Sequence, residues 1–230
     1  MIRQNAVNLF YYRNFKPLAA MLRRISEVRK MHGLILRTFE VFVEDTYGPE
    51  VWSQITQAAG LDVQVFEAML NYEPQIYSAL IGSAEKQLNK PAEAVWEDVG
   101  TYLVSHPNSE GLRRLLRFGG VDFIEFLHSL DDLPDRTRLA VADLVLPDLE
   151  LTDNGQNQFH LIVGDGLPGF AYVMMGVLRA MADDYGALAL LDTTAGQRGE
   201  QILDIKVIET AYAKGRKFEL AANHGAGGSC

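Results

Sequence analysis

Five histidines are the side chains of this sequence that could ligate a metal or transfer a proton near neutral pH. They are His32, His106, His128, His160 and His224. None stands in an H-E-x-x-H or comparable metal-binding spacing, no nucleophile pattern accompanies them, and Cys230 as the only cysteine excludes a thiolate cluster. His32 is the candidate metal ligand that could reach a pocket, although a capping or packing role is the simpler interpretation.

A glycine-rich turn is a second candidate site, because turns of this kind can bind phosphate groups. Residues Gly164–Gly169 read GDGLPG and match G-x-G-x-x-G between an expected strand and an expected helix. Such a turn can hold a pyrophosphate at the helix N-terminus. Against this interpretation, Asp165 places a negative charge beside the phosphates, and the chain offers one β-α-β unit where a dinucleotide fold has several. Nucleotide binding at this turn is therefore retained as an alternative.

The elements that must position these residues fall into two halves. Apolar positions at helical spacing, bounded by proline and glycine, predict helices at 34–45, 49–60, 62–70, 74–89, 91–106, 110–118 and 121–133. After Pro147, alternation and glycine-containing turns predict two strands within 149–164, a long helix at 167–186, and strands at 187–193, 202–209 and 216–221. The sequence thus predicts an α+β fold, with a helical N-terminal half followed by an antiparallel sheet and one long helix.

The composition is that of a globular domain rather than a membrane or secreted protein. Of 230 residues, 48% are hydrophobic and 22% are charged. No stretch approaches the roughly 20 apolar residues that a transmembrane helix needs, and the N-terminus lacks the pattern of a secretory signal. Together with the single cysteine, these features lead us to expect a cytoplasmic protein.

The charge is unevenly distributed along the chain. Residues 1–30 carry a net charge of +6, which leaves −15 on the rest. An acidic body repels phosphate, so we expect no nucleic-acid partner. Asn14–Lys30 is expected to form a helix with an apolar stripe and arginines opposite; packing on the domain is the simplest role, and weak contact with an anionic surface is the alternative. We expect a basic extension over 1–30, one domain over 31–222 and a flexible tail over 223–230, with Met31 as an alternative start.

Three ordered segments resemble the heme-nitric oxide/oxygen binding family, known as H-NOX or HNOB domains. The stretch 31–61 looks like the family's opening, with Met31-x-Gly33 followed by Tyr47-Gly-Pro-Glu-x-Trp52. The stretch 115–134, LLRFGGVDFIEFLHSLDDLP, resembles the helix that approaches the heme ligand, and 159–181 resembles the family's strand and long C-terminal helix. The resemblance covers about residues 31–220. It implies an α+β sensor that binds heme through one histidine and holds the propionates with a Tyr-x-Ser-x-Arg motif.

Both heme-binding features depart from the family pattern here. The histidine position is filled by Pro134, and the propionate motif falls on Leu161, Val163 and Asp165, while Pro147 matches a proline that lies under the heme in the family. Proline offers no lone pair to iron, and leucine and valine cannot hydrogen-bond a carboxylate. Asp165 puts a like charge where the family has a cation. These positions therefore predict a degenerate heme pocket.

The other histidines are poorly placed to substitute. His128 precedes Pro134 by six positions, so it lies off the same helical face. His160 neighbours Leu161 on a strand and points to the opposite side of the sheet. Only His32 has a plausible approach, which makes it the one candidate for non-standard ligation.

These observations favour a non-catalytic, cytoplasmic signalling module of the H-NOX type without conventional histidine-ligated heme. By the resemblance, it would regulate a separate diguanylate cyclase or histidine kinase. The alternatives are a sensor that binds heme or another tetrapyrrole through unusual contacts, and nucleotide binding at Gly164–Gly169.

Overall fold

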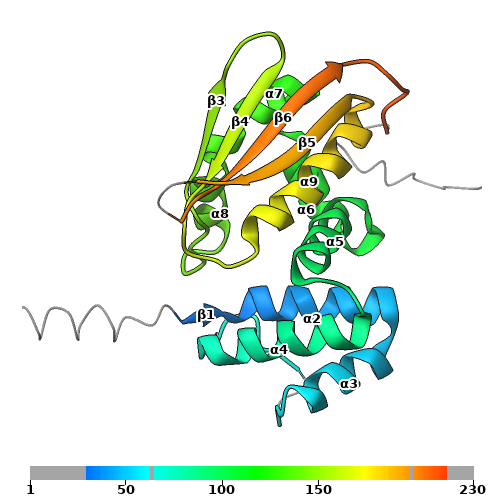
Figure 1. Ribbon diagram of the computed structural model, residues 1–230, viewed down its shortest axis with the longest axis vertical. Helices are drawn as coiled ribbons and strands as arrows, with labels where there is room; N and C mark the ends of the chain where they lie inside the picture. Colours follow the sequence, from blue (N-terminus) through cyan, green and yellow to red (C-terminus); the bar gives the residue numbers. More distant parts are fainter. Residues whose placement is uncertain (1–29, 63–64, 197–198, 217–230) are drawn as a thin grey trace, which may run out of the picture.

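The computed structural model describes residues 30–62, 65–196 and 199–216 and has the predicted α+β architecture (Figure 1). Its helices are α2 (Gly33–Tyr47), α3 (Pro49–Ala58), α4 (Pro74–Leu88), α5 (Ala92–Ser105), α6 (Glu110–Arg117), α7 (Phe123–His128), α8 (Leu133–Ala140) and α9 (Phe170–Tyr185), with 3₁₀ turns η1 (Pro107–Ser109) and η2 (Leu130–Asp132). Its strands are β1 (Met31–His32), β2 (Asn71–Tyr72), β3 (Leu149–Asp153), β4 (Gln158–Val163), β5 (Leu188–Ala195) and β6 (Gln201–Glu209). No helix among these residues is long and apolar enough to cross a bilayer.

Most helix boundaries lie where proline and glycine predict them. Pro49 and Pro74 occupy the first turns of α3 and α4, where the missing N–H costs no helical hydrogen bond. Gly186 ends α9 with φ of 78°, a left-handed conformation that glycine adopts without steric cost. The helix expected at 14–30 and the strand expected at 216–221 lie outside the described residues, except for Lys30 and Arg216.

Two helix predictions are wrong. The segment 62–70 forms turns in its described part, because its one fully buried apolar residue, Phe66, is drawn into the aromatic core rather than forming a helical stripe. The expected helix 121–133 is broken into α7 and η2, and an unpredicted helix, α8, begins at Leu133. At the break, the Ser129 Oγ donates a hydrogen bond to the Phe126 carbonyl oxygen at 2.7 Å, the local side-chain contact with which serine competes with a regular helix.

The larger sheet is antiparallel, with strand order β3-β4-β6-β5. Along β4 the side chains alternate, so that Phe159, Leu161 and Val163 are buried while Gln158 and His160 are exposed. Helix α9 lies along the buried face of this sheet (Figure 1). No parallel pair occurs among the described strands, so the dinucleotide fold required by the nucleotide alternative is not present in this part of the chain.

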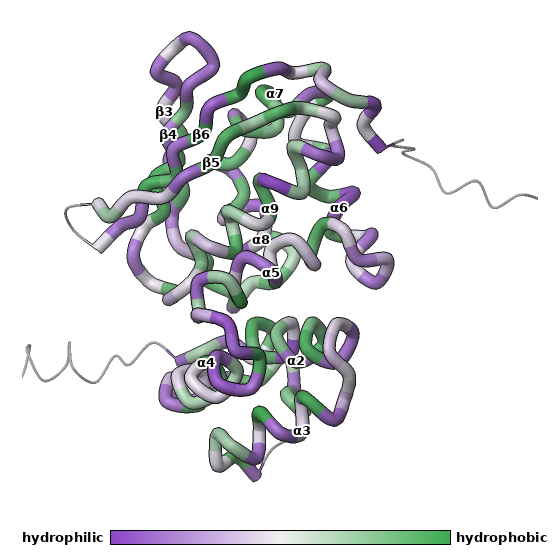
Figure 2. Tube along the Cα trace, turned by 45° about the vertical axis from the view of Figure 1, so that its right-hand side comes forward, coloured by the Kyte–Doolittle hydropathy of each residue, from purple (hydrophilic) through white to green (hydrophobic). Residues whose placement is uncertain are grey.

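The hydrophobic core has two parts. The helical-layer cluster is rich in aromatic residues from α2 to α5, and the sheet-side cluster lies between α9, α7 and the sheet. Figure 2 shows the helical layer below the sheet layer, with hydrophilic residues at the tip of the β3–β4 hairpin. Leu167 and Val173 pack against both clusters and therefore lie where the two layers meet.

The buried carboxylate of Glu40 attaches the 62–70 segment to α2. Its Oε2 accepts a hydrogen bond from the Phe66 backbone N–H at 2.8 Å, and its Oε1 accepts one from the Arg37 guanidinium. Burial raises the pKa of Glu40, although these two donors act in the opposite direction.

We expect the stability difference between the wild type and Glu40→Gln to change with pH. The pKa of Glu40 is higher in the folded protein than in the unfolded chain, where it is about 4.3. The protonated Glu40 carboxyl therefore contributes its full stabilisation below about pH 4.3, and this contribution is lost as the pH rises through the pKa of the folded protein. Glutamine does not titrate and keeps an oxygen for the Phe66 N–H. Urea denaturation should show the variant gaining stability relative to the wild type between about pH 4 and pH 7. The opposite trend would mean that the hydrogen bonds from Arg37 and Phe66 lower the pKa of Glu40 by more than burial raises it.

Candidate functional site: an apolar cavity

A cavity of about 310 Å³ lies between the helical layer and the sheet side of the protein. Its walls come from α2, α4, α5, α6, α8, α9 and the segments that follow α8 and precede α9. The lining residues are Leu34, Ile35, Thr38, Tyr77, Trp96, Val99, Leu103, Leu112, Leu115, Leu116, Leu133, Thr137, Ala140, Val141, Leu144, Leu146, Leu167, Pro168, Phe170, Val173, Met174 and Val177. This lining is almost entirely apolar, as is usual for small-molecule sites.

One wall is formed by two stacked aromatic rings and the glycine-rich turn. The rings of Tyr77 and Trp96 are 5.5 Å apart and nearly parallel, at 9°. The Tyr77 hydroxyl donates a hydrogen bond to the Pro168 carbonyl oxygen. A Cβ on Gly169, whose φ is 81°, would lie 2.3 Å from Trp96 Cδ1, so only glycine allows this close packing. The turn over Gly164–Gly169 therefore helps to close the cavity.

The chemistry of the Tyr77 phenol is limited by this wall. Burial raises the pKa of Tyr77 well above its ordinary value. The phenol therefore stays protonated near neutral pH and serves as a hydrogen-bond donor. It is not poised to act as a phenolate ligand.

The predicted heme-ligand position lies beside the cavity rather than in its lining. Pro134 is buried in the first turn of α8, next to the lining residue Leu133. Pro147 is also buried, next to the lining residue Leu146. Both prolines are therefore sequence neighbours of lining residues, but neither is itself part of the lining.

The three residues at the propionate positions do not come together at the cavity. Leu161 is 0% exposed and Val163 is 3% exposed, and both pack in the sheet-side cluster. Asp165 is exposed on the turn before α9. None of the three is among the lining residues.

Each histidine in the described residues has a local contact that accounts for its position. His32 is 5% exposed and caps α2, because its Nδ1 accepts a hydrogen bond from the Leu34 backbone N–H at 3.2 Å. His106 accepts one from the Asn108 N–H at 3.4 Å and stacks on Tyr102. His128 and His160 are half exposed. The Nε2 of His128 lies 3.9 Å from Asp153 Oδ2, and the Nε2 of His160 lies 3.0 Å from Asp204 Oδ1.

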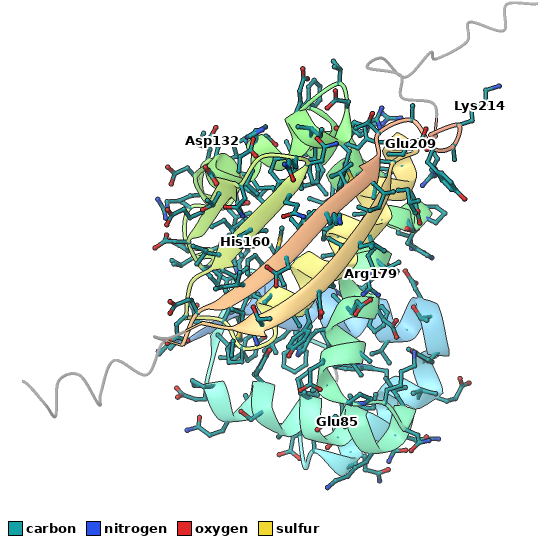
Figure 3. The ribbon with its side chains drawn as sticks, turned by 45° about the horizontal axis from the view of Figure 1, so that its top comes forward. Glu85, Asp132, His160, Arg179, Glu209 and Lys214 are labelled. Atoms are coloured by element: carbon teal, nitrogen blue, oxygen red, sulfur yellow. The ribbon has the colours of Figure 1, made fainter. Side chains whose placement is uncertain are left out.

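Neither His128 nor His160 faces the cavity. His160 is labelled on the sheet in Figure 3, and its strand neighbour Leu161 fills the buried side, as predicted. His224 lies outside the described residues. In the part of the chain that the structure covers, no three histidine, cysteine, aspartate or glutamate residues are arranged to hold a metal ion.

Sequence reasoning missed the polar groups that the cavity does contain. Thr38, Thr137, Tyr77 and Trp96 carry the hydroxyl and indole groups of the lining. The spacing of Leu133, Thr137, Val141 and Leu144 was the available signal, since it places one face of α8 and the following turn on the cavity. The contributions of Tyr77 and Trp96 depend on helix packing and carry no local signature.

Comparison with known proteins gives a consistent result across sequence and structure. The family model described as Haem-NO-binding matches residues 32–189. Soluble guanylate cyclase gcy-31 of Caenorhabditis elegans is 21% identical over 154 residues, which is 67% of this chain and 22% of that protein. Soluble guanylate cyclase 89Db of Drosophila melanogaster is 18% identical over 158 residues, or 69% of this chain and 24% of that protein. The chain spans about a quarter of the length of these relatives.

Solved structures show the same fold. The Fe(II) unliganded H-NOX protein from K. algicida aligns with a TM-score of 0.67 at 18% identity, covering 80% of this chain and 100% of that one. An oxygen-binding H-NOX domain related to soluble guanylate cyclases, solved as its oxygen complex, aligns with a TM-score of 0.60 at 14% identity and covers 81% of this chain and 100% of that one.

Proposed function

Since the chain belongs to the haem-NO-binding family, we propose that it is a non-catalytic sensor module of the H-NOX type that works without a heme held by a histidine. The observation that carries this proposal is the combination of Pro134 at the ligand position and a cavity whose described lining contains neither histidine nor cysteine. The single cysteine, Cys230, supports a cytoplasmic location.

The residues around the cavity do not fit a conventional heme. Heme iron is held in proteins by histidine, cysteine thiolate, methionine with histidine, or tyrosinate. The raised pKa of Tyr77 disfavours tyrosinate, and Met174 is the only methionine in the described lining. The lining also has no lysine or arginine to pair with the heme carboxylates, and exposed Asp165 would repel them.

We expect the purified protein, mixed with hemin, to show no stoichiometric Soret band after gel filtration. The reason is that hemin would find neither an iron ligand nor a cation for its propionates. The measurement is the visible spectrum and the ratio of hemin to protein in the eluted peak. His32→Ala serves as the control, because the same weak, unsaturated hemin absorbance should appear in wild type and variant. A one-to-one complex that survives gel filtration would overturn the proposal, and its loss in His32→Ala would locate the ligand.

The partner of the module is also part of the proposal. The curated relatives are guanylate cyclases, which couple the matched region to a signalling enzyme within one chain. From the family membership, we infer that this domain regulates a signalling protein such as a diguanylate cyclase or a histidine kinase. The test is whether the purified domain changes the rate of such an enzyme from the same organism; no change with either enzyme would contradict this part.

A further inference from the structure

The cavity lining has no formal charge. Its 22 residues, all in the described part of the chain, include no aspartate, glutamate, lysine, arginine or histidine. An ionised ligand group placed there would lose its hydration without gaining a counter-charge, at a cost of several kcal/mol. The lining therefore selects for a neutral ligand.

The size of the cavity fits a small molecule rather than a few waters. An engineered apolar cavity of about 150 Å³ stays dry and binds benzene. The present cavity, at about 310 Å³, is roughly twice as large. Leu115, 40% exposed, and Ala140, also exposed, lie in the lining and mark an open side through which a somewhat longer molecule can extend.

The cavity is bounded by both hydrophobic clusters. Tyr77, Trp96 and Val99 belong to the helical-layer cluster, and Phe170, Met174 and Val177 belong to the sheet-side cluster. A ligand in the cavity would therefore bury apolar surface of both layers at once. A bound ligand would therefore stabilise the packing of the helical layer against the sheet side. A ligand that stabilises one arrangement of the two layers shifts the protein towards it, which is a physical basis for signalling by ligand binding.

We propose that this cavity is a binding site for one neutral, predominantly apolar small molecule with the bulk of fused aromatic rings, held by burial of its apolar surface, with the Thr38 and Thr137 hydroxyls as hydrogen-bond partners for a single uncharged polar group. This inference rests on the proposed function, because it supplies the ligand class for a sensor whose cavity lacks a heme ligand. The site discriminates against carboxylates and other anions because its lining provides no cation.

The experiment uses two fluorescent probes that share one ring system and differ by a single anionic group. N-phenyl-1-naphthylamine is neutral, and 8-anilinonaphthalene-1-sulfonate is the same ring system with a sulfonate. We expect the neutral probe to bind the full-length protein with a stoichiometry of one, with a Kd at least about tenfold lower than that of the sulfonate, and to raise the melting temperature. Equal affinity for the two probes, or no saturable binding of the neutral one, overturns the inference.

Substitutions on α8 locate the binding site. Thr137→Trp and Ala140→Trp place bulk on the lining face of the helix, while Ala142→Trp adds the same bulk at an exposed residue just after the helix and outside the lining. We expect the two lining variants to weaken binding of the neutral probe at least about tenfold and Ala142→Trp to leave it unchanged. Wild-type affinity in both lining variants would place the probe elsewhere and overturn the assignment.

The proposed function and the neutral-ligand site are tested by different measurements. A one-to-one hemin complex overturns the proposed function. The neutral-ligand site is tested separately, by the ratio of the Kd values of the two probes and by the tryptophan variants. If a lining variant fails to fold, which circular dichroism would show, the charge discrimination measured on the wild type still decides the inference.

Discussion

Asp184→Ala is expected to lower the free energy of unfolding by about 3–5 kcal/mol, the range for removing one partner of a buried ion pair. Asp184 is 1% exposed near the C-terminal end of α9. Its Oδ1 accepts a hydrogen bond from Arg113 Nε at 2.8 Å, and its Oδ2 lies 3.4 Å from Arg117 Nη1. The alanine variant would leave Arg113, itself 4% exposed, without this buried carboxylate.

The arrangement also fixes a wall of the cavity. Arg113 and Arg117 lie on α6, whose Leu112, Leu115 and Leu116 line the cavity. Arg117 stacks on the Tyr185 ring at 3.9 Å and donates to the Asp184 carbonyl oxygen, so it also covers the negative end of the α9 dipole. Loss of Asp184 should therefore loosen α6 and weaken binding of the neutral probe as well.

Asp183→Ala is the matched control. Asp183 is the preceding residue on the same helix and is exposed, so its removal should change stability by no more than about 0.5 kcal/mol. Urea denaturation of both variants provides the comparison. If the two variants are equally stable, the buried ion pair does not anchor α6.

Much of the fold could be predicted because local signals and tertiary structure agree. Pro49, Pro74 and Gly186 mark element ends by backbone stereochemistry alone, and the change of hydrophobic period after Pro147 marks the sheet. The segment 62–70 could not be predicted in the same way. Its conformation depends on the buried Phe66 and on the distant carboxylate of Glu40, which a local pattern does not contain.

The candidate site was predictable in part. The sequence singles out Pro134 and Pro147, which are buried next in sequence to the lining residues Leu133 and Leu146 without lining the cavity themselves. It also singles out Leu161, Val163 and Asp165, but their distance from the cavity lining follows from sheet register and helix packing. Alternation along β4 was sufficient to predict that His160 faces away from Leu161, since strand geometry fixes that relation locally.

The second large effect concerns the crossing of α5 and α9. A Cβ on Gly176 would lie 2.0 Å from the Glu97 carbonyl oxygen, and a Cβ on Gly100 would lie 2.0 Å from the Val173 carbonyl oxygen. Both helices therefore approach backbone to backbone. Arg179 of α9, labelled in Figure 3, also forms an ion pair with Glu97 of α5. The atoms that would clash belong to the main chain, so no side-chain rotation can relieve the overlap.

Gly176→Ala should therefore destabilise the protein by about 3 kcal/mol, the upper end of the usual range for overpacked cores, even though alanine is the better helix former. Gly82→Ala is the control, because Gly82 lies within α4 with no atom within 4 Å of its Cβ position, and this change should stabilise by about 0.5–1 kcal/mol. Urea denaturation should thus give shifts of opposite sign for the same chemical change. Helices α5 and α9 contribute Trp96, Met174 and Val177 to the cavity. Gly176→Ala should therefore also weaken binding of the neutral probe, whereas Gly82→Ala should leave that binding unchanged. A stabilised Gly176→Ala variant would show that the two backbones are not in contact.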